Sequence, residues 1–208
     1  MEQTQQNRGG EKKSFFTARN ITWFAILLAL VIVLQCFAGS IVIGTTSFSL
    51  VLIPIVLGGI LLGPIAGGVL GFAFGLITLI YGVVGMDPLF TTPLFYASPF
   101  MTALICLGKG TAAGVGAAWI YRLIARKNRH AAVFAAAAAA PILNTGLFIL
   151  GALCISDVIA ELFAGGASVL YFLVIGCAGV NFLVEFAVNM ILSPALWAVI
   201  RALERRSE

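Results

Sequence analysis

The sequence predicts an all-α membrane protein, a bundle of six transmembrane helices with both termini in the cytoplasm. Three observations lead to this fold class: a low share of charge, apolar runs of membrane-spanning length, and grouped basic residues. Only 10% of the 208 residues are charged and 61% are hydrophobic, with a mean hydropathy of +1.09. Soluble domains carry about 25% charged residues, so this chain cannot cover a globule in water.

The apolar runs are long enough to cross a hydrocarbon core of about 30 Å at about 1.5 Å per helical residue. Gly63 and Pro64 separate two of them by a minimal turn, because proline suits the first turn of a helix. Glycines within residues 176–179 divide the long final run, whose first part, 168–175, is expected to dip into the outer part of the protein. The expected spans are 21–38, 48–62, 64–83, 100–121, 131–154 and 181–200.

Basic residues border the apolar runs in three groups: the N-terminal tail, the internal loop around residues 122–129, and the C-terminal end. Six spans place all three groups on one side of the membrane. Basic loops mark the cytoplasmic side, so both termini are predicted to be cytoplasmic. The other side then receives Asp87, Asp157 and Glu161 and no lysine or arginine.

No polar stretch is long enough to form a second domain. The expected membrane domain covers residues 21–203, between a disordered cytoplasmic tail, residues 1–20, and a short one, residues 204–208. The four cysteines lie in apolar segments without metal-ligand spacing, and no cofactor is predicted. The chain also lacks the GxxxxGK[ST], HExxH and nucleophile-elbow motifs, so an integral-membrane enzyme is unsupported.

Small residues four apart allow helices to pack closely in lipid. Three such ladders occur: Gly67, Gly71 and Gly75 in the third span, Gly110, Gly114 and Ala118 in the fourth, and Ala25 and Ala29 in the first. We expect the first two to pack within the bundle. Taken alone, the alanine pair has the same interpretation.

Two ionisable residues, Lys109 and Glu185, fall inside predicted spans. Such a group costs at least about 2.5–3.5 kcal/mol at mid-bilayer, so each marks a candidate functional site. Asn181 and Asn189 lie four residues either side of Glu185 and share its helix face. The further candidates are Asn144, which follows Pro141 in the fifth span, Gln35 near the outer end of the first span, and Tyr96 in an outer loop.

Two interpretations of Lys109 and Glu185 remain open. In one, they pair with each other and hold the fourth and sixth spans together. In the other, they line a pocket reached from outside, where Lys109 meets a ligand anion and the amides bind its polar groups. Aromatic and hydroxyl residues of the outer loops, Tyr96 among them, could then close over the ligand.

Three stretches resemble one known family of membrane proteins. Residues 48–75, FSLVLIPIVLGGILLGPIAGGVLGFAFG, resemble the span 2–3 hairpin of the substrate-binding (S) components of energy-coupling-factor (ECF) transporters. Residues 141–148 resemble span 5 of the same family, and residues 181–194 resemble span 6. The resemblance extends over essentially the whole chain after residue 20.

The resemblance implies a vitamin-binding subunit in the cell membrane of a prokaryote, which partners a membrane T component and two cytoplasmic ATPases. It also implies that Ala25 and Ala29 dock the T component, and that the chain needs no ATP motif of its own. A solitary small-solute transporter or channel and a membrane enzyme are the alternative classes.

Within the family, the hairpin and Asn144–Thr145 look most like the pantothenate-type members. Lys109 suits the carboxylate of pantothenate, a small hydroxy-acid amide, although the pantothenate-type pattern has an arginine near this position. S components for riboflavin, folate or another vitamin are the alternatives.

Overall fold

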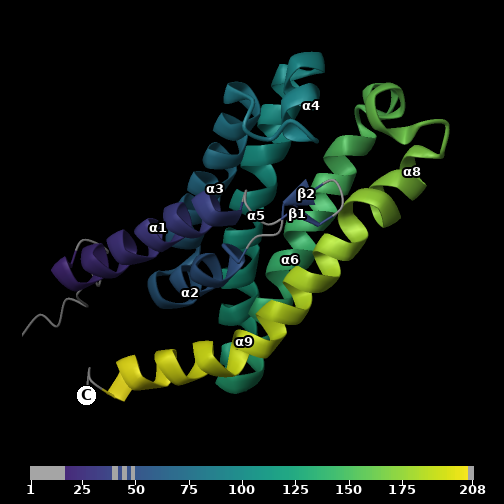
Figure 1. The fold of residues 1–208 in the computed structure, drawn as a ribbon. Helices are drawn as coiled ribbons and strands as arrows, with labels where there is room; N and C mark the ends of the chain where they lie inside the picture. The colour runs from purple at the N-terminus through teal and green to yellow at the C-terminus, as the bar shows by residue number, and fades with distance from the viewer. Residues whose placement is uncertain (1–16, 39–41, 44–45, 48–49, 206–208) are drawn as a thin grey trace, which may run out of the picture.

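The computed structural model describes residues 17–38, 42–43, 46–47 and 50–205, and it is a helical bundle (Figure 1). The all-α prediction is confirmed: the only strands in these ranges form a two-residue antiparallel ladder, β1 (Val42–Ile43) with β2 (Thr46–Ser47). The α-helices are α1 (Ala18–Ala38), α2 (Leu52–Leu62), α3 (Pro64–Val84), α4 (Thr91–Ala97), α5 (Pro99–Ala125), α6 (Arg129–Leu153), α7 (Ser156–Ile159), α8 (Val169–Tyr171) and α9 (Val180–Arg205). Two π-helical segments are η1 (Ala160–Ala164) and η2 (Phe172–Gly179).

Five helices are long and apolar enough to cross a membrane: α1, α3, α5, α6 and the continuous segment Val169–Leu203. The predicted second span is represented by α2, which has only 11 residues. Its length of about 16 Å is half the hydrocarbon thickness of about 30 Å. Five of the six predicted crossings are therefore helices of spanning length. Most of the predicted terminal tails, residues 1–16 and 206–208, lies outside the described residues.

The predicted break before the last span is wrong. Helical structure continues from Val169 to Arg205, because η2 joins α8 to α9 through the wider π-helical turn. Glycine suits this turn: a Cβ atom on Gly179 would lie 2.5 Å from the carbonyl oxygen of Val174. Pro194 lies inside α9, which bends in its C-terminal part (Figure 1), as expected where proline removes a backbone hydrogen bond.

Two predicted outer loops also contain helices. The loop 85–99 holds α4, and the loop 156–166 holds α7 and η1. The Asp87 side chain accepts a hydrogen bond from the Thr91 backbone N–H at 3.1 Å, which satisfies a donor at the start of α4. Prolines favour loops in a sequence, but Pro93 lies in the first turn of α4, where its missing N–H costs little.

The glycine ladders of α3 and α5 pack within the bundle, as predicted, and the structure shows that they pack against each other. A Cβ atom on Gly67 would lie 2.7 Å from the carbonyl oxygen of Gly114. One on Gly71 would collide with the carbonyl oxygen of Gly110, and one on Gly110 would collide with the carbonyl oxygen of Gly71. The two backbones therefore touch, and we call this contact the glycine seam.

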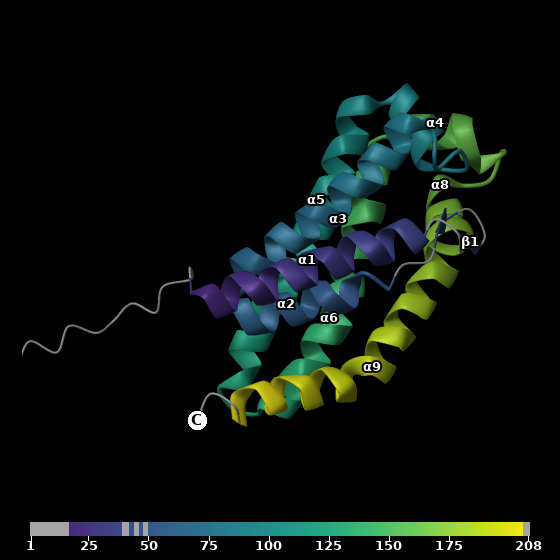
Figure 2. The same cartoon turned by 60° about the vertical axis from the view of Figure 1, so that its left-hand side comes forward.

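Two apolar clusters form the core. The inner cluster joins α1, α2, α3, α5, α6 and α9 and includes Val31, Ile55 and Leu70. The outer cluster joins the residues around α4, η1 and η2 and includes Phe90 and Leu173. Both views place α4 and α8 at one end of the bundle, opposite the start of α1 and the end of α9 (Figures 1 and 2).

Candidate functional site

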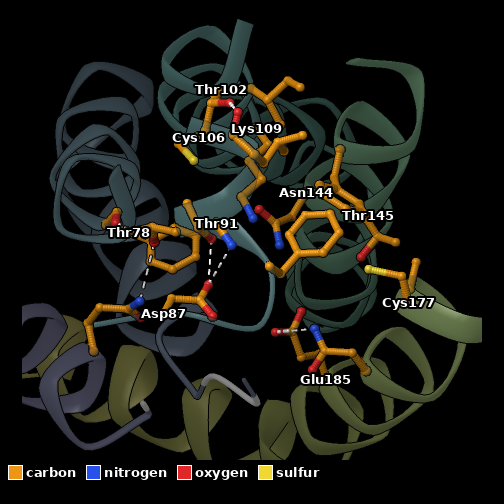
Figure 3. Close-up of a pocket in the computed structure, with 18 residues that line it drawn as sticks. Thr78, Asp87, Thr91, Thr102, Cys106, Lys109, Asn144, Thr145, Cys177 and Glu185 are labelled. Atoms are coloured by element: carbon orange, nitrogen blue, oxygen red, sulfur yellow. Dashed lines mark hydrogen bonds between the residues drawn. The ribbon is translucent and has the colours of Figure 1, made fainter. Parts of the chain in front are cut away.

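A cavity of about 840 Å³, including its open mouth, contacts both apolar clusters (Figure 3). Side chains from α1, α3, α4, α5, α6, η2 and α9 line it. Small-molecule sites combine apolar walls with a few polar groups. Here Phe74, Phe90 and Phe148 supply apolar walls between the polar side chains.

The structure brings five of the seven predicted ligand-site residues together around this cavity. They are Gln35, Lys109, Asn144, Asn181 and Glu185. They come from α1, α5, α6 and α9, which are far apart in the sequence. Gln35 is buried, and its Nε2 donates a hydrogen bond to Thr78 Oγ1 at 3.2 Å, which links α1 to α3.

The other two predicted residues do not line the cavity. Asn189 lies one helical turn beyond Glu185, is 1% exposed, and donates a hydrogen bond to the Glu185 carbonyl oxygen at 2.8 Å. Tyr96 is 72% exposed on α4. Asn189 therefore lies beneath the site, and Tyr96 lies on the outer surface.

Lys109 extends from α5 into the cavity (Figure 3). Its Nζ lies 5.8 Å from the ring centroid of Phe74 and 5.3 Å from that of Phe148. These distances allow cation–π attraction, which stabilises an ammonium group in partly apolar surroundings. Lys109 forms no ion pair with any described residue, so the direct Lys109–Glu185 pair of the first interpretation is not seen.

Two amide oxygens at the cavity lack partners. Asn144 is 6% exposed, and its Oδ1 accepts no hydrogen bond from the described residues. The same holds for Oδ1 of Asn181, whose Nδ2 donates to Glu185 Oε1 at 3.4 Å. An unsatisfied buried acceptor costs about 1–3 kcal/mol. A ligand that brings hydrogen-bond donors would recover this energy.

Sequence reasoning missed Asp87 and the threonines of the site. Thr78, Thr91, Thr102 and Thr145 line the cavity together with Asp87. Threonine is common in membrane helices and carries little signal by itself. Spacing could have found one of them, because Thr102 lies seven residues before Lys109 and therefore on the same face of α5.

The charges of the cavity are unequally placed. Lys109 enters from one side, and Asp87 and Glu185 enter from the other (Figure 3). One ammonium and two carboxylates give these three side chains a formal charge of −1. The cavity therefore offers one position for an anionic group and several positions for hydrogen-bond donors.

Fold and site together define a polytopic helical membrane protein with a polar, ligand-sized cavity at one end of its bundle. The model of the family "ECF transporter, substrate-specific component" matches residues 19–197, and the chain belongs to this family. It is thus a multi-pass membrane protein and a transporter subunit, which acts with T and ATPase components on a small-molecule substrate. No curated protein matches the sequence.

Proposed function

We propose that this S component captures a small water-soluble vitamin that carries a carboxylate, with pantothenate as the best candidate. The observation that carries the proposal is the Lys109 ammonium, which lies in the cavity between two aromatic rings without an ion-pair partner among the described residues. Lys109 is partly buried, and a charge withdrawn from water without a partner is costly. A ligand carboxylate would supply the missing charge and a charge-assisted hydrogen bond.

Pantothenate also fits the remaining polar groups by its chemistry. It carries one carboxylate, two hydroxyls and one amide N–H. The hydroxyls and the N–H are the donors that the Asn144 and Asn181 oxygens need, and its methyl groups suit the phenylalanine walls.

Riboflavin and folate are the alternative substrates. Riboflavin has no carboxylate, so its binding would leave the Lys109 ammonium without a counter-charge. Folate has two carboxylates, and the second would meet a cavity in which Asp87 and Glu185 already outnumber Lys109. Both are less well matched to the charges than a monocarboxylate with several donors.

The proposal is tested by identifying the ligand. Mass spectrometry of small molecules released from the purified protein should detect pantothenate. Titration should give tighter binding of pantothenate than of riboflavin or folate under the same conditions. Retention of either alternative vitamin, with no binding of pantothenate, would contradict the proposed substrate.

Ala25 and Ala29 are proposed to dock the T component. Both are exposed on α1, so neither is buried within the bundle. A flat strip of small side chains lets a second helix approach closely. Co-purification of a T component and two ATPases with the chain would also separate the S component from a solitary transporter.

We further propose that the protein lies in the cell membrane of a prokaryote with both termini in the cytoplasm. The start of α1, the α5–α6 turn and the end of α9 lie at the end of the bundle opposite α4 and α8 (Figure 1), and they carry Arg19, residues 126–129 and Arg205. Basic residues favour the cytoplasmic side, so the cavity faces outward. The native Cys36 and Cys154 are exposed, so the wild type is the control. Stronger labelling of a Lys127→Cys variant than of the wild type by an impermeant reagent added outside would contradict this orientation.

A further inference from the structure

We propose that Asp87 is a second ligand-binding residue, which accepts hydrogen bonds from the hydroxyls of the ligand and ties the ligand to α4. The inference rests on the proposed function, because it takes the ligand carboxylate to lie at Lys109. It assigns a role to a loop carboxylate that sequence reasoning placed only on the outer side.

The two oxygens of Asp87 have different surroundings. Its Oδ2 accepts hydrogen bonds from the backbone N–H of Thr91 at 3.1 Å and from Thr91 Oγ1 at 2.5 Å. Within the described part of the chain, no residue donates a hydrogen bond to Oδ1. Asp87 lines the cavity and is only partly buried (Figure 3). One oxygen therefore holds the start of α4, and the other remains available to a ligand.

Electrostatics sets the orientation of the ligand. Asp87 repels a carboxylate, so the ligand carboxylate is most stable next to Lys109, on the other side of the cavity. Ionised carboxylates only accept hydrogen bonds, so the opposite end of the ligand must present donors. Asn144 is 6% exposed, and its Oδ1 atom has no partner among the described residues. This oxygen therefore also needs a hydrogen-bond donor from the ligand. The matching class is a carboxylate with two or more donors at its far end.

Contact with Asp87 would also connect the ligand to the outer part of the bundle. Phe90, immediately before α4, stacks on Phe163 of η1 with ring centroids 4.8 Å apart. It also packs edge-on against Phe148 of α6 at 5.5 Å. Thr102 of α5 donates a hydrogen bond to the carbonyl oxygen of Leu94 in α4 at 3.0 Å. A ligand that bridges Lys109 and Asp87 would therefore join α5 to α4 across the cavity.

The test combines one variant pair with one ligand pair. Asp87→Asn keeps a good helix-capping side chain, so α4 should remain folded. Asp157→Asn is the matched control, because Asp157 is an exposed carboxylate at the same end of the molecule. The ligands are pantothenate and an N-acyl-β-alanine of similar size that lacks both hydroxyls. Calorimetric titration gives two affinities, one for each ligand, for each of the two variants and for the wild type.

Asp87→Asn should weaken pantothenate binding about 10- to 100-fold, the range expected for a lost charged hydrogen bond. Binding of the hydroxyl-free analogue should stay the same or become slightly tighter, because a repelling carboxylate has been removed. Asp157→Asn should change neither affinity. An Asp87→Asn variant that binds pantothenate as tightly as the wild type, or that loses affinity for both ligands equally, would overturn the inference.

Failure of the proposed substrate gives a different result. If the wild-type protein bound neither ligand, pantothenate would be excluded as the substrate. The role of Asp87 would then be tested with the molecule that the protein retains through purification. Mass spectrometry should then find that molecule lost from Asp87→Asn and kept by Asp157→Asn. Equal retention by the two variants would overturn the role of Asp87.

Discussion

The helices α3 and α5 pack closely at one position and line a cavity at another. At the glycine seam, Gly67 and Gly71 face Gly114 and Gly110, and the backbones touch. At the cavity, the same two helices contribute Phe74, Thr78, Thr102 and Lys109. Side-chain size decides the difference, because glycine lets the helices meet whereas larger side chains fill or border the space between them.

The two regions also differ in polarity. The inner cluster beside the seam consists of apolar side chains, and its stability depends on close packing. The cavity contains buried amide oxygens without partners and a lysine without an ion pair among the described residues. Such groups reduce the stability of the folded protein and are usually kept for function. A bulky residue should therefore have a different effect in each region.

The largest effect is expected at the seam. Gly110→Leu should lower the free energy of unfolding by about 3 kcal/mol or more, because its side chain would collide with the α3 backbone at Gly71. The control is Gly108→Leu on the same helix, where an added Cβ meets nothing within 4 Å. Thermal unfolding in detergent compares the two. Equal melting temperatures would contradict the packing of α3 on α5.

A bulky residue in the cavity should affect binding more than folding. Thr145→Trp would fill space next to Asn144 and should weaken ligand binding by more than about 100-fold, or about 2.7 kcal/mol. The melting temperature should change less than in Gly110→Leu, because the new side chain enters the cavity and not the glycine seam. Ile142→Trp is the control, since Ile142 is 51% exposed on the same helix. Normal pantothenate binding by Thr145→Trp would place the ligand elsewhere.

The smallest effect on the isolated protein is expected on the exposed face of α1. Ala29→Trp should change neither the melting temperature nor ligand affinity, because Ala29 is exposed on α1. It should nevertheless prevent assembly with the T component, which pull-down measures. Leu30→Trp, which changes another exposed residue of α1, should assemble normally. Assembly of both variants would remove Ala25 and Ala29 from the docking surface.

The sequence predicted most of the fold because hydrophobicity and small residues act locally. The turn at Gly63–Pro64 and the glycine ladders followed from chemistry that neighbouring residues determine. The sequence did not predict the continuous last helix, because Gly176 and Gly179 are typical of a helix break. Only the structure shows a π-helical turn there. The sequence did not predict helix α4, because the prolines in and around it are typical of a loop.

The site was predicted in part for a similar reason. Lys109 and Glu185 can be recognised from the sequence alone, because an ionisable side chain inside a membrane span is costly whatever residues it contacts in the fold. Asp87 does not stand out, since a carboxylate in a loop is normally solvated, and its position at the cavity depends on the path of the chain between α3 and α4. The placement of Tyr96 on the outer surface depends equally on the orientation of α4.

The most direct test of the ligand role of Lys109 is titration of Lys109→Gln alone and together with Glu185→Gln. If Lys109 contacts the ligand carboxylate, the single variant should lose about 1.5–3 kcal/mol of affinity, about 10- to 150-fold. The double variant should fold, as its melting temperature will show, and should still bind pantothenate weakly. A well-folded double variant that binds with wild-type affinity would show that Lys109 only balances the charge of Glu185, and would contradict the account.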